Sequence, residues 1–226
     1  MPEPAAIHTN GGGTPAQPDP EFTILSVEGA KHTATPMLRF TGQMAERSGH
    51  EVYTVALKAQ IMIEPAKRAY DDDTRAKLAD LFGEPERWAT TTNAFLLADV
   101  DVLLPTFTGS TAFTLTLPVS YDLEVAAAKY LYSLPDGIAP LSFNFTGTIF
   151  YRGESGAMQI VQVPWECSTK FAMPVSAVRE TIGYHYPGGG WVRLSDDTLE
   201  RLSLRKAQRG LHSYDAAIDE LLEEEG

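Results

Sequence analysis

The stretch Glu51–Glu64, EVYTVALKAQIMIE, has the pattern of a long, half-buried β-strand. Apolar side chains recur at every second position, and mostly polar side chains lie between them. The residues that share the apolar face are Tyr53, Val55, Leu57, Ala59, Ile61 and Ile63. Successive side chains of a strand point to opposite faces of a sheet, so this period predicts a strand with one face on a core. The opposite face, with Thr54, Lys58 and Gln60, is expected to be at least partly wet.

Shorter runs with strand character lie on both sides of this stretch. They cover residues 22–28, 36–44, 93–105, 110–120, 140–153 and 157–166. The last two runs are separated by the turn Gly153–Gly156 and are expected to form a β-hairpin. Together with Glu51–Glu64 they predict about seven strands, arranged as an antiparallel sheet or as a sandwich. The sequence leaves open whether the sheet closes on itself or lies open under helices.

Helical patterns interrupt the strands and then dominate the C-terminal part of the chain. Inserted helices are expected within residues 66–88 and 121–134, and three more within 175–186, 196–210 and 213–225. Ser195 and Ser213 are the predicted N-caps of the last two helices, and Gly210 follows the end of the first of them. The predicted fold class is therefore α+β.

Three segments follow from these patterns. Residues 1–21 are rich in Pro, Gly, Ala and Thr and contain little that a core could bury, so they are expected to form a disordered tail. Residues 22–173 are expected to form a β-rich core domain with inserted helices. Residues 174–226 are expected to form a C-terminal helical segment whose last helix is acidic.

The composition excludes several classes of partner. The 226 residues include 18 basic and 30 acidic side chains, which give a net charge of -12. This charge repels phosphate backbones and anionic lipid, so neither nucleic acid nor a membrane surface is an expected partner. No run approaches the roughly 20 apolar residues that cross a bilayer. The N-terminus lacks the pattern of a secretory signal, and one cysteine cannot form an intramolecular disulfide, so we expect a cytoplasmic protein.

Cys167, in VPWECSTKFAMPV, is the only thiol and raises the question of chemistry. A nucleophilic thiolate requires a nearby base or cation, and the candidates for that role are His185 and Lys170. A thiol-dependent enzyme centred on Cys167 therefore stays an alternative. Packing just past the final strand, between Pro164 and Pro174, is the expected role of this side chain.

No other pattern indicates catalysis, a metal or a cofactor. The five histidines lie far apart without the spacing of a zinc site. The glycine run within residues 185–191 lacks the Lys and the Ser or Thr of a phosphate loop. We therefore expect no catalytic residue, no metal site and no cofactor. A small-ligand pocket between the sheet and the C-terminal helices remains a second alternative.

Two kinds of side chain are candidates for partner binding. Trp165 and Trp191 lie in turns, where exposed aromatic side chains form protein-binding patches. The last helix carries carboxylates without a basic residue after Ser213. It is either a solvated edge helix or an acidic docking element. The carboxylates proposed for docking are Asp219, Glu220, Glu223 and Glu224.

Longer motifs carry a resemblance to a known family. These are EPERW (residues 84–88), PTFTG (105–109), the run YDLEVAAAKYLYSLPDGIAPLSFNFTGTIFY (121–151), VPWE (163–166) and FAMPVSAVRE (171–180). The chain resembles, from Phe22 to about Leu211, a bacterial family classed as a domain of unknown function. Genes of that family tend to lie beside genes of nickel-iron hydrogenases. The resemblance implies a role in assembling or maturing that enzyme, and it supplies no catalytic residues.

A looser resemblance concerns the first strands alone. Pro36, Leu38 and Phe40, followed by EVYTVAL at Glu51–Leu57, are similar to the opening strands of the SecB export chaperone. Beyond Glu64 the pattern departs from that chaperone. The lack of a catalytic pattern, the acidic composition and the family resemblance together predict a non-enzymatic, cytoplasmic accessory protein that acts as an assembly or maturation factor or as a chaperone-like binder. The expected partners are hydrogenase subunits or maturation proteins, and the oligomeric state is left open.

Overall fold

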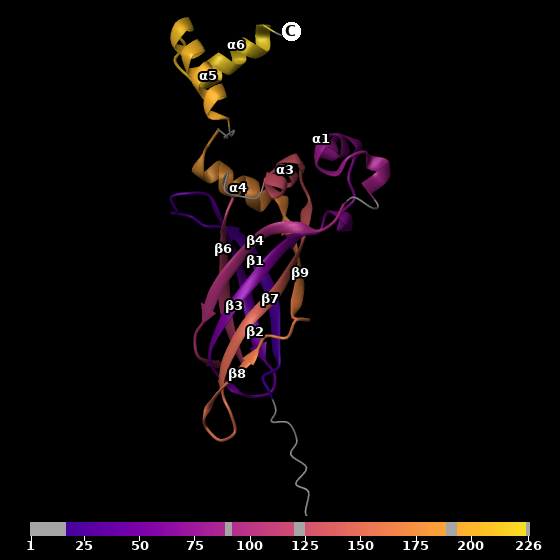
Figure 1. Cartoon of the computed structure of the whole chain (residues 1–226), viewed down its shortest axis with the longest axis vertical. Coiled ribbons are helices and arrows are strands. Elements are labelled where there is room, and N and C mark those ends of the chain that lie inside the picture. The colour runs from indigo at the N-terminus through magenta and orange to yellow at the C-terminus, as the bar shows by residue number, and fades with distance from the viewer. Residues whose placement is uncertain (1–16, 89–91, 120–124, 189–193, 225–226) are drawn as a thin grey trace, which may run out of the picture. The chain divides into compact units, whose positions relative to one another are not determined.

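The computed structural model describes residues 17–88, 92–119, 125–188 and 194–224 (Figure 1). The chain divides into two compact units, one within Met1–Gly188 and the other within Gly189–Gly226. Residues 1–16 of the predicted tail lie outside the described residues, and the first strand begins at Pro20.

The first unit is built from two antiparallel sheets (Figure 1). The described residues form nine strands, where the sequence patterns predicted about seven. Their bounds are β1 Pro20–Gly29, β2 Met37–Glu46, β3 Glu51–Ile63, β4 Phe95–Leu104, β5 Phe107–Thr108, β6 Ser110–Pro118, β7 Ile138–Arg152, β8 Met158–Gln162 and β9 Ser168–Pro174. One sheet has the order β1-β2-β6. The other has the order β4-β3-β7-β8, with β5 also paired to β3 and β9 also paired to β7. The α+β fold class is confirmed.

Strand β3 lies inside the larger sheet, between β4 and β7. From Val55 to Ile63 its alternate side chains are buried, as the sequence period predicted. Tyr53 differs, because the pairing with β7 shifts between Val52 and Thr54. This irregularity adds a residue to one strand, so Val52 points into the core and Tyr53 is only half-buried.

The core fills the space between the two sheets with apolar side chains, among them several phenylalanines. The ring of Phe22 stacks on Phe145 with centroids 4.4 Å apart. Phe40 meets Phe143 edge to face at 5.3 Å. At the sides of the unit β4 lies against β6 and β1 lies against β9, so the sheets meet along both edges. The arrangement is therefore a sandwich rather than an open layer.

The segment between Pro164 and Pro174 contains a strand that the sequence patterns missed. Strand β9 pairs with the first half of β7, while β8 pairs with its second half. Cys167 therefore precedes a strand instead of following the last one, and its backbone oxygen accepts a bond of 2.9 Å from Phe145 N. Strand β9 alternates between exposed and less exposed side chains, but it has only seven residues and ends at a proline.

Helices gather at one end of the sandwich, opposite the turn that joins β7 to β8 (Figure 1). Their bounds are η1 Pro65–Lys67, α1 Asp72–Phe82, η2 Pro85–Arg87, α3 Val125–Ser133 and α4 Val175–His185. Asp71 caps α1, with its side chain accepting a bond of 2.7 Å from Thr74 N. Helix α4 packs on β1, β2 and β9. The approach is so close that a Cβ on Gly29 would lie 2.4 Å from Thr181 Oγ1.

The C-terminal helical segment was expected to begin at residue 174. Because α4 packs on the sandwich, it belongs to the first unit, and the division lies between Gly188 and Gly189. No helix of the described residues is long and apolar enough to cross a lipid bilayer.

Glu46 is a buried carboxylate at the last residue of β2, where the loop to β3 begins, with 4% of its surface exposed. Oε1 accepts N–H bonds from Asp19 and Ser48, both at 3.0 Å, and the Ser48 hydroxyl as well. Oε2 accepts N–H bonds from Gly49 at 2.7 Å and from His50 at 2.8 Å. Burial alone would raise the pKa of Glu46, but these hydrogen bonds outweigh it and hold the pKa below its ordinary value. The carboxylate therefore ties the loop to the first residues of the chain that the structure describes.

The second unit contains α5 Asp196–Arg209 and α6 Tyr214–Glu224. The predicted caps are confirmed. Ser195 Oγ accepts a bond of 3.3 Å from Thr198 N, and Ser213 Oγ accepts one of 3.1 Å from Ala216 N. Gly210 ends α5 in the left-handed conformation with φ 66°.

Candidate functional site

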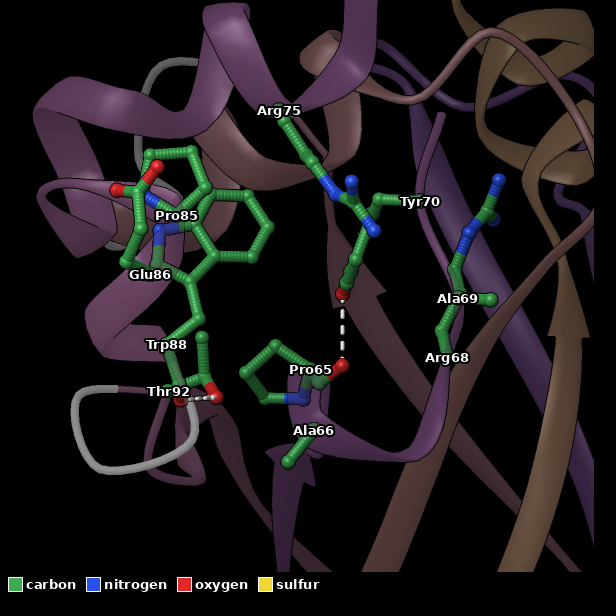
Figure 2. A pocket seen from close by; sticks show the side chains of 10 residues that line it. All are labelled: Pro65, Ala66, Arg68, Ala69, Tyr70, Arg75, Pro85, Glu86, Trp88 and Thr92. Atoms are coloured by element: carbon green, nitrogen blue, oxygen red, sulfur yellow. Dashed lines mark hydrogen bonds between the residues drawn. The ribbon is translucent and has the colours of Figure 1, made fainter. Parts of the chain in front are cut away.

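A hollow of about 620 Å³ lies at the helical end of the sandwich (Figure 2). It is bounded by η1 with the residues that follow it, by the start of α1, and by η2 with Trp88 and Thr92. Figure 2 shows the indole of Trp88 on one side of the hollow, Arg75 and Tyr70 on another, and Pro65 at the base. The volume falls within the range of small-molecule sites.

Aromatic packing holds the wall of this hollow in place. Trp88 contacts the rings of both Tyr70 and Phe82, with centroids 5.4 and 5.5 Å apart. The indole Nε1 of Trp88 donates to Gly83 O at 2.9 Å. Phe82 in turn lies against Tyr130 of α3. The wall is therefore an extension of a packed aromatic cluster and not a loose loop.

A pair of tyrosine hydroxyls lies beneath the wall. Tyr70 Oη donates to Pro65 O at 2.8 Å, so the hydroxyl of Tyr130, 2.8 Å away, must donate to Tyr70. Burial, followed by this hydrogen bond, raises the pKa of Tyr130 far above its ordinary value, and burial also raises the pKa of Tyr70. Both phenols stay protonated at neutral pH and fix the position of η1.

The charged side chains of the hollow are largely engaged. Arg68 turns its guanidinium away from the centre and donates to the backbone oxygens of Asp136 and Ile138, both at 2.8 Å (Figure 2). Arg75 lies 3.2 Å from the carboxylate of Asp72. The hollow offers a cation and aromatic walls, and its lining includes no nucleophile beside a base. Its chemistry suits binding better than catalysis.

Cys167 is half-buried, and its Sγ lies 3.6 Å from Pro20 O. Burial raises the pKa of the thiol, and the carboxylates of Glu166 and Asp19 raise it further. The protonated thiol is a poor nucleophile at neutral pH. Its surroundings correspond to the packing role expected from the sequence.

His185 lies at the other end of the sandwich from Cys167, because β9 runs from Cys167 toward α4 and His185 is the last residue of α4 (Figure 1). The imidazole Nδ1 lies 2.9 Å from Thr181 O, and Nε2 lies 3.1 Å from Thr33 Oγ1. The contact with Thr33 ties α4 to the turn between β1 and β2, whereas the contact with Thr181 lies within α4. The two residues proposed for a thiol-dependent site are therefore not brought together.

Trp165 is 90% exposed in the turn between β8 and β9. A side chain of this size gains nothing for the fold in that position, so the sequence-based proposal of a contact residue remains consistent with its placement. On β8 nearby, Met158 and Ile160 are each 61% exposed. Trp191, the other proposed contact residue, lies outside the described residues.

The carboxylates proposed on α6 fall into two groups. Glu220 contacts two guanidinium groups of α5, Arg209 at 2.7 Å and Arg205 at 3.7 Å. It therefore holds the two helices together and is not available as a free docking charge. Asp219 and Glu223 are exposed. The side chain of Glu224, the last residue of the helix, lies outside the described part of the chain.

Metal ligands do not cluster in the part of the chain that the structure describes: no three His, Cys, Asp or Glu side chains there are placed to share an ion.

Comparison with known proteins identifies a family for this chain but no activity. No curated protein matches the chain. The crystal structure of the ApaA protein from Bordetella pertussis is 13% identical, over 70% of this chain and 95% of that one, with a TM-score of 0.26. The X-ray structure of another structural genomics target is 7% identical, over 78% and 93% of the two chains, with a TM-score of 0.24. Such low scores support no conclusion about this chain.

The match to a protein family is much more extensive, since it spans residues 17–226 and so includes both compact units. The chain belongs to the family of unknown function DUF6084.

Proposed function

We propose that this chain is a non-enzymatic, cytoplasmic accessory protein that binds a protein partner, as an assembly or maturation factor or a chaperone-like binder for a nickel-iron hydrogenase. The choice of partner rests on the gene neighbourhood of the family that the sequence resembles. The chaperone-like character rests on the resemblance of the first strands to SecB.

The observation that carries the binding role is the incomplete core of the second unit. Among the described side chains of this unit, residues 194–223, only Ala217 is buried, while large apolar side chains of both helices are exposed. Units of fewer than about 40 residues rarely have enough core to be stable without a disulfide, a metal or a partner. A partner that covers these side chains would supply the missing core.

The experiment is affinity purification from cells that express the hydrogenase, read by mass spectrometry. The full chain is compared with a chain that ends at Gly188, because that boundary leaves the first unit intact. Hydrogenase subunits or maturation proteins should be recovered with the full chain and lost with the shortened one. Recovery of neither class with the full chain would refute the proposal.

A small-ligand function is the second candidate, favoured by the hollow beside Trp88 and Arg75. This hollow is lined by η1, α1 and η2, whereas the pocket expected from the sequence lay between the sheet and the C-terminal helices. A bound ligand at 100 times its dissociation constant stabilises a fold by about 2.7 kcal/mol. A metabolite panel should then contain a compound that raises the midpoint of thermal unfolding, and Arg75→Ala should remove that effect. The thiol-dependent alternative receives no comparable support, because the pKa of Cys167 is raised.

A further inference from the structure

Helix α6 presents two parallel rows of exposed side chains. The first row, here called the apolar row, consists of Tyr214, Ile218 and Leu222, which are 43%, 40% and 65% exposed. The second, here called the acidic row, consists of Asp215, Asp219 and Glu223, all exposed. Members of each row are four residues apart, so they lie above one another on one face, and the two rows are neighbours.

The contacts between the helices leave most of both rows open. Glu220 pairs with arginines of α5, and Ala217 is buried. Tyr214 does contact α5: its hydroxyl lies 2.9 Å from Ser203 Oγ, and Lys206 Nζ lies over its ring at 5.3 Å from the centroid. Among the described residues, no cation forms an ion pair with the acidic row. The apolar row is thus bordered by carboxylates without counter-charges.

We propose that the apolar and acidic rows of α6 form the docking face for a basic amphipathic helix of a protein partner. This inference rests on the proposed binding function and deepens it by naming the chemistry of the partner element. An apolar stripe of the partner helix packs on Ile218 and Leu222, and lysines or arginines along its border face Asp215, Asp219 and Glu223.

The match of shape and charge favours a basic helix over the other occupants. The apolar row is about 12 Å long, because Leu222 lies eight positions after Tyr214 and the helix rises 1.5 Å per residue. A partner helix of three to four turns covers that length. An extended strand would leave its backbone groups unpaired on a helix surface. A second copy of α6 would bring two acidic rows together, and like charges at an interface are unfavourable.

The binding test uses three synthetic peptides of roughly 18 residues, long enough to form a helix. The first has leucines in one stripe with lysines along its borders. The second has glutamates in place of the lysines, and the third has the composition of the first in scrambled order. Each carries a fluorescent label, and binding to the full chain is measured by anisotropy at moderate salt. The first should bind, the second should not, and the third should bind at least tenfold more weakly.

Variants of the full chain identify the face. Leu222→Ala should weaken binding of the first peptide about tenfold, because it removes the most exposed apolar side chain of the row. Its control is Leu103→Ala, which removes an equally exposed side chain from β4. Asp219→Lys should weaken binding similarly, and its control is Asp101→Lys, which makes the same change of net charge on β4. Both controls should bind as the unchanged protein does.

Three results would overturn the inference. Equal weakening by Asp219→Lys and Asp101→Lys would show attraction to net charge alone. Equal binding of the ordered and scrambled peptides would show that the apolar row is not used. A dimer in sedimentation velocity that Leu222→Ala dissociates would identify a second copy as the occupant.

The affinity purification separates this inference from the proposed function. If Leu222→Ala and the unchanged chain recover hydrogenase proteins equally, the proposed docking face is wrong, while the proposed function is still supported. If the first peptide binds but no hydrogenase proteins are recovered, the proposed function is refuted, while the proposed docking face is still supported.

Discussion

Replacing Glu46 by glutamine is expected to destabilise the first unit by an amount that depends on pH. The two carboxylate oxygens accept four backbone N–H groups in all, two on each oxygen. Glutamine keeps one oxygen and places an NH2 group where the other was. Two N–H groups then face a donor and lose their acceptor. Each buried polar group left without a partner costs about 1 to 3 kcal/mol, so we expect a loss of about 2 to 6 kcal/mol for the two N–H groups.

The pH dependence follows from the direction of the pKa shift. The pKa of Glu46 is lower in the folded chain than its ordinary value of 4.5. The stabilisation by the carboxylate is therefore fully present above about pH 4.5 and is lost as the pH falls through the folded pKa. Glutamine does not titrate. The difference in unfolding free energy between the two proteins should thus shrink as the pH falls from 6 to 3.

Urea unfolding at several pH values, followed by circular dichroism and tryptophan fluorescence, measures this difference. Glu21→Gln is the matched control, because Glu21 pairs with Arg47 near the same loop but is exposed. An exposed pair contributes about 0 to 1 kcal/mol. A loss below about 0.5 kcal/mol for Glu46→Gln at pH 6 would refute the assignment of Glu46 as the acceptor that orders this loop, since surface substitutions have effects of that size. A difference that stays constant from pH 6 to 3 would refute it as well.

Three further predictions test other parts of the structure. Tyr130→Phe should lower the free energy of unfolding by about 0.5 to 1.5 kcal/mol. Tyr70→Phe should lower it more, because it leaves both Pro65 O and the Tyr130 hydroxyl without a partner. Equal losses in urea titrations would contradict the assigned direction of these hydrogen bonds. Cys167 should react with iodoacetamide at pH 7 more slowly than a free thiol, because burial raises its pKa, and a faster reaction measured by mass spectrometry would show an activated thiolate. Trp165→Ala should not change the midpoint of urea unfolding measurably, because the side chain is 90% exposed. Recovery of a protein partner should decrease. A lower midpoint would show that the indole contributes to the stability of the fold.

A strand could be predicted where it has enough residues to show its period, but the closure of the two sheets into a sandwich could not. From Val55 to Ile63 every second side chain faces the core, and that alternation is visible in the sequence. Strand β9 has seven residues, begins after Cys167 and ends at Pro174. The sequence pattern of so short a strand does not differ from that of an extended connection, which Pro164 and Pro174 also favour. The irregularity beside Tyr53 was equally hidden, because it depends on the register with β7 and not on β3 itself.

Glu46 shows why a buried polar site can escape a sequence-based search. Four of its hydrogen-bond donors are backbone N–H groups, which every residue except proline provides. No spacing of side chains therefore marks the site. The hollow beside Trp88 was missed for a related reason, because its walls come from segments that meet only after the sheets have formed.

The carboxylates of α6 could be found from the sequence, but their division into two roles could not. A count of charges assigns Glu220 and Asp219 to the same acidic helix. Glu220 is drawn toward α5 because Arg205 and Arg209 lie four residues apart and so present two cations on one side of that helix. This pairing fixes the rotation of α6 about its axis. Once that rotation is fixed, the side chains on the remaining faces, with Leu222 beside Glu223, are the ones left for another molecule. The internal ion pairs thus decide which charges of this helix can take part in binding.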